Sequence, residues 1–156
     1  MPTKKMILTQ NLVFNLPLCV IMTATASIVN HVPFTVGTVI QYFIGLVAIE
    51  ILGFVIPVQK IAMGIGAKFF PGKNPMAMPQ FLLPAAVLTV IFTVPMTLIM
   101  TFVGLKMGGV PLNIYWFAFL GTLPWMLLAA YVSVLIFLPL SMKVSGLDKM
   151  GPPPQK

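Results

Sequence analysis

Charged residues are scarce in this chain of 156 residues, where they make up only 7% of the sequence. A typical soluble domain carries about 25% charged residues. Here 59% of the residues are apolar, and the mean hydropathy is +1.05. A surface with so little charge would be poorly wetted. The composition therefore excludes an ordinary soluble domain and predicts a protein whose solvent is the lipid bilayer.

Acidic residues are scarcer still, because the sequence holds only Glu50 and Asp148. Two carboxyl groups leave little material for hydrolytic catalysis. The sequence also shows no nucleophile elbow, phosphate-binding loop, metal-ligand spacing or pair of carboxylates. We therefore predict that the protein is not an enzyme and uses no cofactor or metal.

Cysteine and histidine each occur once, as Cys19 and His31. A single cysteine excludes an internal disulfide and a cysteine metal cluster. Its apolar surroundings favour a small packing residue over a reactive thiol. His31 has no second histidine or carboxylate near it in sequence, so it is interpreted as an interfacial residue and not as a metal ligand.

Arginine is absent, and the nine basic residues are all lysine. They stand at the ends of apolar runs, which indicates membrane topology and not a surface that binds nucleic acid. The N-terminus, the 60–80 segment and the C-terminal tail hold eight of them, whereas the other connections hold only Lys106. This asymmetry predicts that both termini are cytoplasmic. A lysine-only composition also suggests an AT-rich genome, and hence a bacterial inner membrane.

Four long apolar runs are present, at about 10–30, 34–58, 81–102 and 112–142. Each is long enough to cross a hydrocarbon core of ~30 Å at ~1.5 Å per helical residue. The first run resembles a secretory signal peptide, but its asparagines, its proline and its internal copy favour a retained span. Within the glycine- and proline-rich segment after the second run, residues 61–70 suit a short interfacial helix that carries Lys68.

One segment of the sequence is repeated. Residues 11–23, NLVFNLPLCVIMT, recur 78 positions later as TVIFTVPMTLIMT at 89–101. The similarity continues into the next run at an offset of 82, where Pro57 meets Pro139. We therefore predict an all-α integral membrane protein whose four transmembrane helices form two tandem parallel-repeat hairpins. Its parts are a first two-span repeat (1–70), a cytoplasmic hinge (71–80), a second two-span repeat (81–146) and a solvated tail (147–156).

Polar side chains recur at intervals of four in both copies of this segment. In the first copy they are Asn11, Asn15, Cys19, Thr23 and Ser27, and in the second they are Thr89, Thr93, Thr97 and Thr101. One interpretation is that these small residues allow helices to cross closely and bond to each other. The other is that they line a polar path for a substrate or ion.

Glu50 is the one acidic residue inside a predicted span, about 12 Å from the cytoplasmic end at ~1.5 Å per residue. A charge near a helix centre costs about 2.5–3.5 kcal/mol on insertion scales. Two interpretations follow. Glu50 exchanges a proton or cation, with a threonine as a candidate partner, or it is a neutral carboxyl group at a helix or subunit interface.

Prolines and an aromatic residue also fall inside the predicted spans. A proline frees the carbonyl four residues before it, which in lipid needs another partner. Trp125 is expected to pack inside the bundle, whereas Tyr115 and Trp116 are expected to anchor the interface. The prolines expected within spans are Pro17, Pro57, Pro95, Pro124 and Pro139.

Each half resembles the small bacterial two-span membrane family called domain of unknown function 2798. Three features carry the resemblance: a first span that ends in a polar residue, an aromatic start to the second span, and an exit of proline followed by lysine. They are found at 27–30, at 42–43 and 115–117, and at 57–60 and 139–143. The resemblance covers nearly the whole chain as a tandem pair, and it implies no activity.

Two functional classes remain open from the sequence. The first is a small transporter or channel with Glu50 and the polar stripes on its route, which predicts a homo-oligomer because four spans enclose little volume. The second is an accessory or structural membrane subunit, in which the stripes only hold helices together or attach them to a larger complex. In both cases the partners are the bilayer and other membrane subunits, and not nucleic acid.

Overall fold

The computed structural model describes residues 3–31, 33–72 and 80–146, and within them all regular structure is helical. The predicted all-helical fold is confirmed, and four elements are long and apolar enough to cross a membrane, as the four predicted spans require. They are α1 (Lys4–Val29), α2 (Val36–Val55), α4 (Leu82–Met107), and α5 (Tyr115–Ser145) with the short 3₁₀ turn η1 (Leu112–Ile114) before it. A shorter helix, α3 (Val58–Phe69), lies between α2 and α4. The predicted tail at 147–156 lies outside the described residues.

Helices α1 and α4 extend further than the apolar runs suggested. α1 begins six residues earlier than expected because Thr3 caps it, accepting a hydrogen bond from the backbone N–H of Met6 at 3.3 Å. α4 continues to Met107, so part of the predicted glycine-rich connection is helical. Gly104 has a structural reason to be glycine there, since a Cβ atom would lie 3.2 Å from the side-chain amide of Gln41.

Helix α2 is shorter than predicted, and Pro57 lies after it and not inside a span. Ile56 has φ −95° and ψ 113°, the extended conformation that a following proline favours. Pro57 then occupies the cap position at the start of α3. The other four prolines do lie inside helices: Pro17 in α1, Pro95 in α4, and Pro124 and Pro139 in α5.

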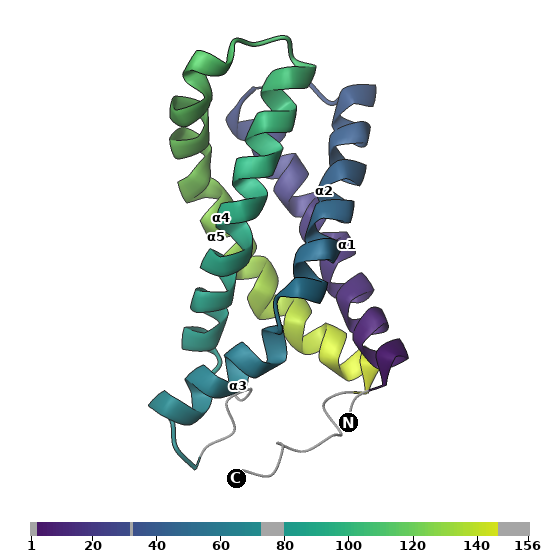
Figure 1. Cartoon of the computed structure of the whole chain (residues 1–156), viewed down its shortest axis with the longest axis vertical. Coiled ribbons are helices and arrows are strands. Elements are labelled where there is room, and N and C mark those ends of the chain that lie inside the picture. Colours follow the sequence, from purple (N-terminus) through teal and green to yellow (C-terminus); the bar gives the residue numbers. More distant parts are fainter. Residues whose placement is uncertain (1–2, 32, 73–79, 147–156) are drawn as a thin grey trace.

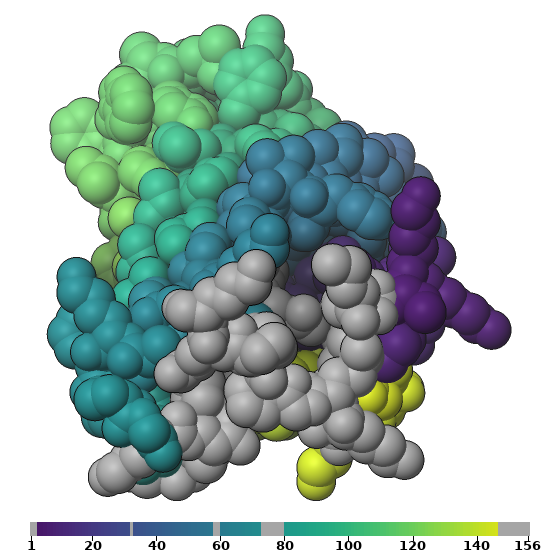
Figure 2. Space-filling model, turned by 60° about the horizontal axis from the view of Figure 1, so that its bottom comes forward, coloured from purple at the N-terminus to yellow at the C-terminus, as the bar shows by residue number. Residues whose placement is uncertain are grey.

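The four long helices form a closed bundle in which each packs on two neighbours. α1 contacts α2 and α5, and α4 also contacts α2 and α5, so the order around the bundle is α1, α2, α4, α5. α3 packs on α4 and crosses one end of the bundle, the end at which α1 begins and α5 finishes (Figure 1). We call this the lysine-rich end, because Lys4, Lys5, Lys60, Lys68 and Lys143 belong to these segments. Figure 2 looks onto it.

Helix α3 has one buried and one exposed side. Ala62 and Gly66 are buried, whereas Lys60 and Lys68 are exposed. Such a pattern is typical of a helix that lies along a membrane surface with its lysines toward water and headgroups. The structure therefore confirms the short helix that was expected to carry Lys68.

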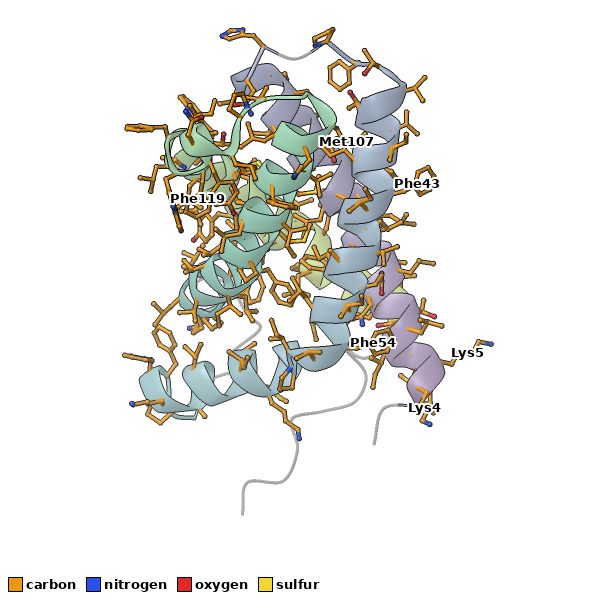
Figure 3. The ribbon with its side chains drawn as sticks, turned by 45° about the horizontal axis from the view of Figure 1, so that its top comes forward. Lys4, Lys5, Phe43, Phe54, Met107 and Phe119 are labelled. Carbon is orange, nitrogen blue, oxygen red and sulfur yellow. The ribbon has the colours of Figure 1, made fainter. Side chains whose placement is uncertain are left out.

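The outer surface of the bundle is apolar along rows of residues spaced by four. On α1 the row consists of Leu8, Leu12, Leu16 and Val20. Phe43 projects outward from α2 in the same manner (Figure 3). Trp125 is 57% exposed, so the expectation that it packs inside was wrong. It lies with Leu128 and Val132 on the outward face of α5, where lipid contact satisfies an apolar side chain.

Candidate functional site

The polar stripes predicted on α1 and α4 point into the bundle. Asn15, Cys19, Thr23 and Ser27 are buried, and Asn11 is half-buried. On α4, Thr89, Thr93 and Thr97 are buried and Thr101 is half-buried. The same spacing of four that keeps the polar residues inside keeps the leucine row of α1 outside. We refer to these nine residues together as the polar ridge.

Glu50 is held by a member of the polar ridge. Asn15 Nδ2 donates to Glu50 Oε1 at 3.0 Å, and the bond connects α1 to α2. The partner is thus an asparagine, not the threonine that was a candidate from the sequence. Glu50 lies five residues before the end of α2, so it is about 8 Å from that end at ~1.5 Å per residue and not 12 Å. It is half-buried, at the seam between α1 and α2.

A cavity of about 720 Å³ opens at the lysine-rich end of the bundle, and we call it the lysine-end cavity. Its polar lining comes from Lys4, Gln10, Asn11 and Asn15 of α1 and from Lys60 of α3. Its apolar lining includes Phe14, Phe54, Ile56, Phe92 and Leu138. All four long helices and α3 therefore contribute to it, and it lies within the size range of small-molecule sites.

Asn11 carries an unsatisfied donor in this cavity. Its Nδ2 atom is buried and has no hydrogen-bond partner among the described residues. Leaving a buried donor unpaired costs about 1–3 kcal/mol. Gly53 lies beside this amide, since an added Cβ would lie 3.4 Å from Asn11 Nδ2 and 3.8 Å from Asn15 Nδ2, at ordinary contact distance. A ligand oxygen in the cavity is one group that would satisfy the donor.

A second cavity, of about 430 Å³, lies at the opposite end, and we call it the far-end cavity. It is formed where α1 and α4 finish and α2 and α5 begin. No charged side chain lines it within the described chain. Its polar groups are hydroxyls and amides, namely Ser27, Asn30, Thr35, Thr38, Gln41, Thr97, Thr101 and Thr122.

Hydrogen bonds at the far-end cavity connect the four long helices in two pairs. Asn30 and Thr122 approach to 3.5 Å between α1 and α5, and Gln41 Nε2 donates to the Met100 carbonyl at 3.3 Å between α2 and α4. Thr97 differs from these residues, since its hydroxyl is buried without a partner in the described part of the protein. Each cavity is thus lined by one residue with a buried polar atom that has no hydrogen-bond partner in the described bundle.

A buried, mostly apolar layer separates the two cavities. Thr23, Thr93 and Ser133 are buried at the same level, and we call the apolar members of the layer the apolar belt. Its members are buried, belong to all four long helices, and line neither cavity within the described structure. On each helix the belt residues fall between those that line one cavity and those that line the other. They are Leu18, Met22, Ile49, Met96, Ala130 and Val134. Two of its members are methionines, whose unbranched side chains adapt their shape easily.

The predicted site residues separate into three groups in the structure. Asn11 and Asn15 line the lysine-end cavity, and Thr97 and Thr101 line the far-end cavity. Glu50 lines neither in the described structure but bonds to Asn15, which lines one. The remaining three predicted residues, Thr23, Thr89 and Thr93, are buried and line neither cavity within the described residues. Thr89 bonds within its own helix, to the Ala85 carbonyl at 2.8 Å.

Several cavity residues were not singled out from the sequence. Lys4 and Lys60 were counted only as topology signals, although both line the lysine-end cavity. Gln41 and Thr122 had a detectable signal, because each is a polar residue within an apolar run. What the sequence lacked was the pairing of α1 with α5 and of α2 with α4, which brings these residues together.

The chain matches no family model, no curated protein and no solved structure. The similarity to the two-span family therefore stays a prediction.

Proposed function

We propose that the protein is a small membrane transport protein whose path runs through its own bundle. The two cavities are the two halves of this path, and the apolar belt is its closed gate. The observation that carries the proposal is the position of the cavities at opposite ends of the same four helices. Because apolar constrictions block ions and water by dewetting, a thin belt is sufficient to close such a path.

Glu50 acts in this scheme through Asn15. The carboxyl group lies beside the lysine-end cavity, and its bond to Asn15 connects its protonation state to an amide that lines the cavity. A carboxyl group at membrane depth with a polar partner is a common element of proton-coupled transporters. We assign Glu50 the role of a proton- or cation-exchanging group at the edge of the path.

The two halves of the bundle are proposed to be repeats related by an axis along the membrane normal. Two features support this relation. α1 and α4 each contain 26 residues, and equivalent positions are buried alike, as with Phe14 and Phe92 or Met22 and Met100. The lysine-rich end is assigned to the cytoplasm of a bacterial inner membrane, following the positive-inside rule.

Truncation of the apolar belt tests the transport function. Leu18 is 2% exposed within the belt, and Leu128 is 59% exposed on the outward face of α5, so the two form a matched pair. We expect Leu18→Ala to raise the release of K⁺ and Cl⁻ from salt-loaded proteoliposomes several-fold. Leu128→Ala should remain at the level of the original protein, which should be close to that of empty liposomes.

A second substitution shows whether the leak uses the cavities. Gly53 lines the lysine-end cavity, so Gly53→Leu places a side chain in it. Added to Leu18→Ala, it should suppress the leak. Gel filtration would confirm that each variant is folded. Equal release from the Leu18→Ala and Leu128→Ala proteins would contradict a path through the bundle.

A second candidate function, that of an accessory membrane subunit, is favoured by α2. It is the least buried of the four long helices, and its outward face carries Phe43, Val47 and Ile51. A partner helix or a second copy of this chain would find a broad apolar surface there. If both leucine variants release salt like empty liposomes, this second function is the better account.

A further inference from the structure

We propose that the lysine-end cavity binds an amphipathic anion, that is, a phosphate or carboxylate head on a hydrocarbon body. The inference names the substrate class of the proposed transporter and to that extent rests on the proposed function. It also predicts binding that is measurable without transport. The charge, the donors, the apolar walls and the position of this cavity all favour such a ligand.

The charge of the lining is positive. Lys4 from the start of α1 and Lys60 from α3 both line the cavity, and no acidic residue of the described chain does. Of the two acidic residues, Asp148 lies outside the described residues, and Glu50 bonds to Asn15. Two ammonium groups from separate helices at one opening attract an anionic head.

The donor in the wall adds a second, independent observation. Asn11 lines the cavity, and its Nδ2 atom is buried and has no partner within the described structure. An amide N–H of this kind donates to a phosphate or carboxylate oxygen. The cavity therefore offers one neutral donor deeper along α1 and two ammonium groups, one at the start of α1 and one on α3.

The remaining wall is hydrocarbon. Phe14, Phe92 and Leu138 contribute apolar surface from α1, α4 and α5, and Phe54 and Ile56 contribute it from the end of α2. This lining suits an alkyl body. The combination of a charged rim with an apolar wall selects a ligand that has both parts.

We place the opening of the cavity at the depth of the lipid headgroups, because it lies at one end of the four candidate spans. Lys4 is the first residue of α1, and α3 crosses the end of the bundle at the same level (Figure 1). Basic pockets between membrane helices at this level bind the headgroups of anionic lipids. The ligand can thus enter from the bilayer as an acidic phospholipid or from water as a soluble amphiphile.

Two matched pairs of lysines make the test specific. Lys4 and Lys5 leave α1 in different directions (Figure 3), and only Lys4 is among the cavity-lining residues. Lys60 and Lys68 are both exposed on α3, and only Lys60 lines the cavity. Replacing either lysine of a pair lowers the net charge of the protein by the same amount. A difference in binding between the two variants of a pair would therefore show a specific site.

The experiment uses the full chain in phosphatidylcholine nanodiscs and octyl phosphate as the probe, with calorimetric detection. We expect Lys4→Gln, Lys60→Gln and Asn11→Leu each to weaken binding about five- to tenfold, as loss of a charge-assisted bond does. Lys5→Gln and Lys68→Gln should leave it unchanged. Inorganic phosphate and octanol, which each lack one part of the ligand, should bind more weakly.

A second arm identifies the source of the ligand. Native mass spectrometry would measure whether phosphatidylglycerol stays bound to the protein and whether Lys60→Gln, but not Lys68→Gln, releases it. Retention of the lipid with no binding of octyl phosphate identifies a membrane lipid, and the reverse identifies a soluble amphiphile. Both results support the site.

Other outcomes overturn the inference. Equal losses within both lysine pairs would show diffuse surface charge, and octanol binding as tightly as octyl phosphate would show a purely apolar cavity. These failures are separable from failure of the transport proposal. If octyl phosphate binding depends on Lys60 but Leu18→Ala causes no leak, the binding site is supported and the transport path is contradicted.

Discussion

At the scale of single residues, the bond between Asn15 and Glu50 is the most informative contact in the bundle. A carboxyl group among apolar helices needs a polar partner in either protonation state. Asn15 supplies one at 3.0 Å, and it does so from the helix that lines both cavities. The pair therefore serves the packing of α1 on α2 and, in our proposal, the coupling of protonation to transport.

Replacement of Glu50 separates its structural role from its proposed chemical role. In the Glu50→Gln variant an amide oxygen can still accept the bond from Asn15, so the free energy of unfolding should be nearly unchanged. In Glu50→Leu the Asn15 donor loses its partner, which should cost about 1–3 kcal/mol. Thermal unfolding in detergent measures both. Equal loss in the two variants would contradict the role assigned to the bond.

Gly45 of α2 lies against the side chain of Met100 of α4. A Cβ atom there would lie 3.0 Å from Met100 Sδ and 3.2 Å from its Cε atom. Because the methionine end is flexible, we expect Gly45→Ala to be tolerated, whereas Gly45→Val should cost about 1–3 kcal/mol by overpacking. Gly121→Val on α5, where nothing lies within 4 Å, is the control. The unfolding midpoint is the measurement, and equal effects at both positions would refute the close contact.

At the scale of elements, the sequence indicated the existence of the helices better than their ends. Hydropathy alone locates four spans, because each must present lipid with an apolar surface. The start of α1 depended on a cap at Thr3, and the end of α2 depended on the backbone of Ile56 before Pro57. Such local hydrogen bonds and backbone torsions do not affect a mean hydropathy taken over 20 residues.

The two prolines paired by the proposed repeat have different effects on their helices. Pro57 stands between α2 and α3, whereas Pro139 lies inside the continuous helix α5. The chain can follow either course after a proline, since the freed carbonyl needs only some other partner. Contact of α3 with α4 accompanies the break in the first half. Sequence alone could not distinguish these outcomes.

Two glycines at the lysine-rich end should respond to alanine in opposite ways. Gly146 ends α5 with φ +74°, in the left-handed region, so Gly146→Ala should cost about 1–2 kcal/mol. Gly64 lies inside α3 with nothing within 4 Å of an added Cβ, so Gly64→Ala should stabilise the protein by about 0.5–1 kcal/mol. The unfolding midpoints of the two variants are compared. A loss of stability at both positions would contradict the open space beside Gly64.

At the scale of the whole molecule, the site depends on pairings that a single sequence does not reveal. The inward direction of the polar ridge follows from its spacing of four and was predictable. The division of its residues between two cavities was not, because it requires the contacts of α1 with α5 and of α2 with α4. The cavities also include lysines and hydroxyls that lie outside the repeated segments.

We propose that one bundle holds two cavities that open to opposite sides of a membrane and are separated by a closed belt. Single cysteines placed in a Cys19→Ala background test it directly with a membrane-impermeant maleimide in oriented vesicles. The positions are Asn11→Cys in the lysine-end cavity, Thr101→Cys in the far-end cavity and Met22→Cys in the belt.

We predict that the Asn11→Cys protein reacts only from the cytoplasmic side and the Thr101→Cys protein only from the opposite side. The Met22→Cys protein should react from neither. Reaction of the Asn11→Cys or the Thr101→Cys protein from both sides, or of both proteins from neither side, would contradict the account.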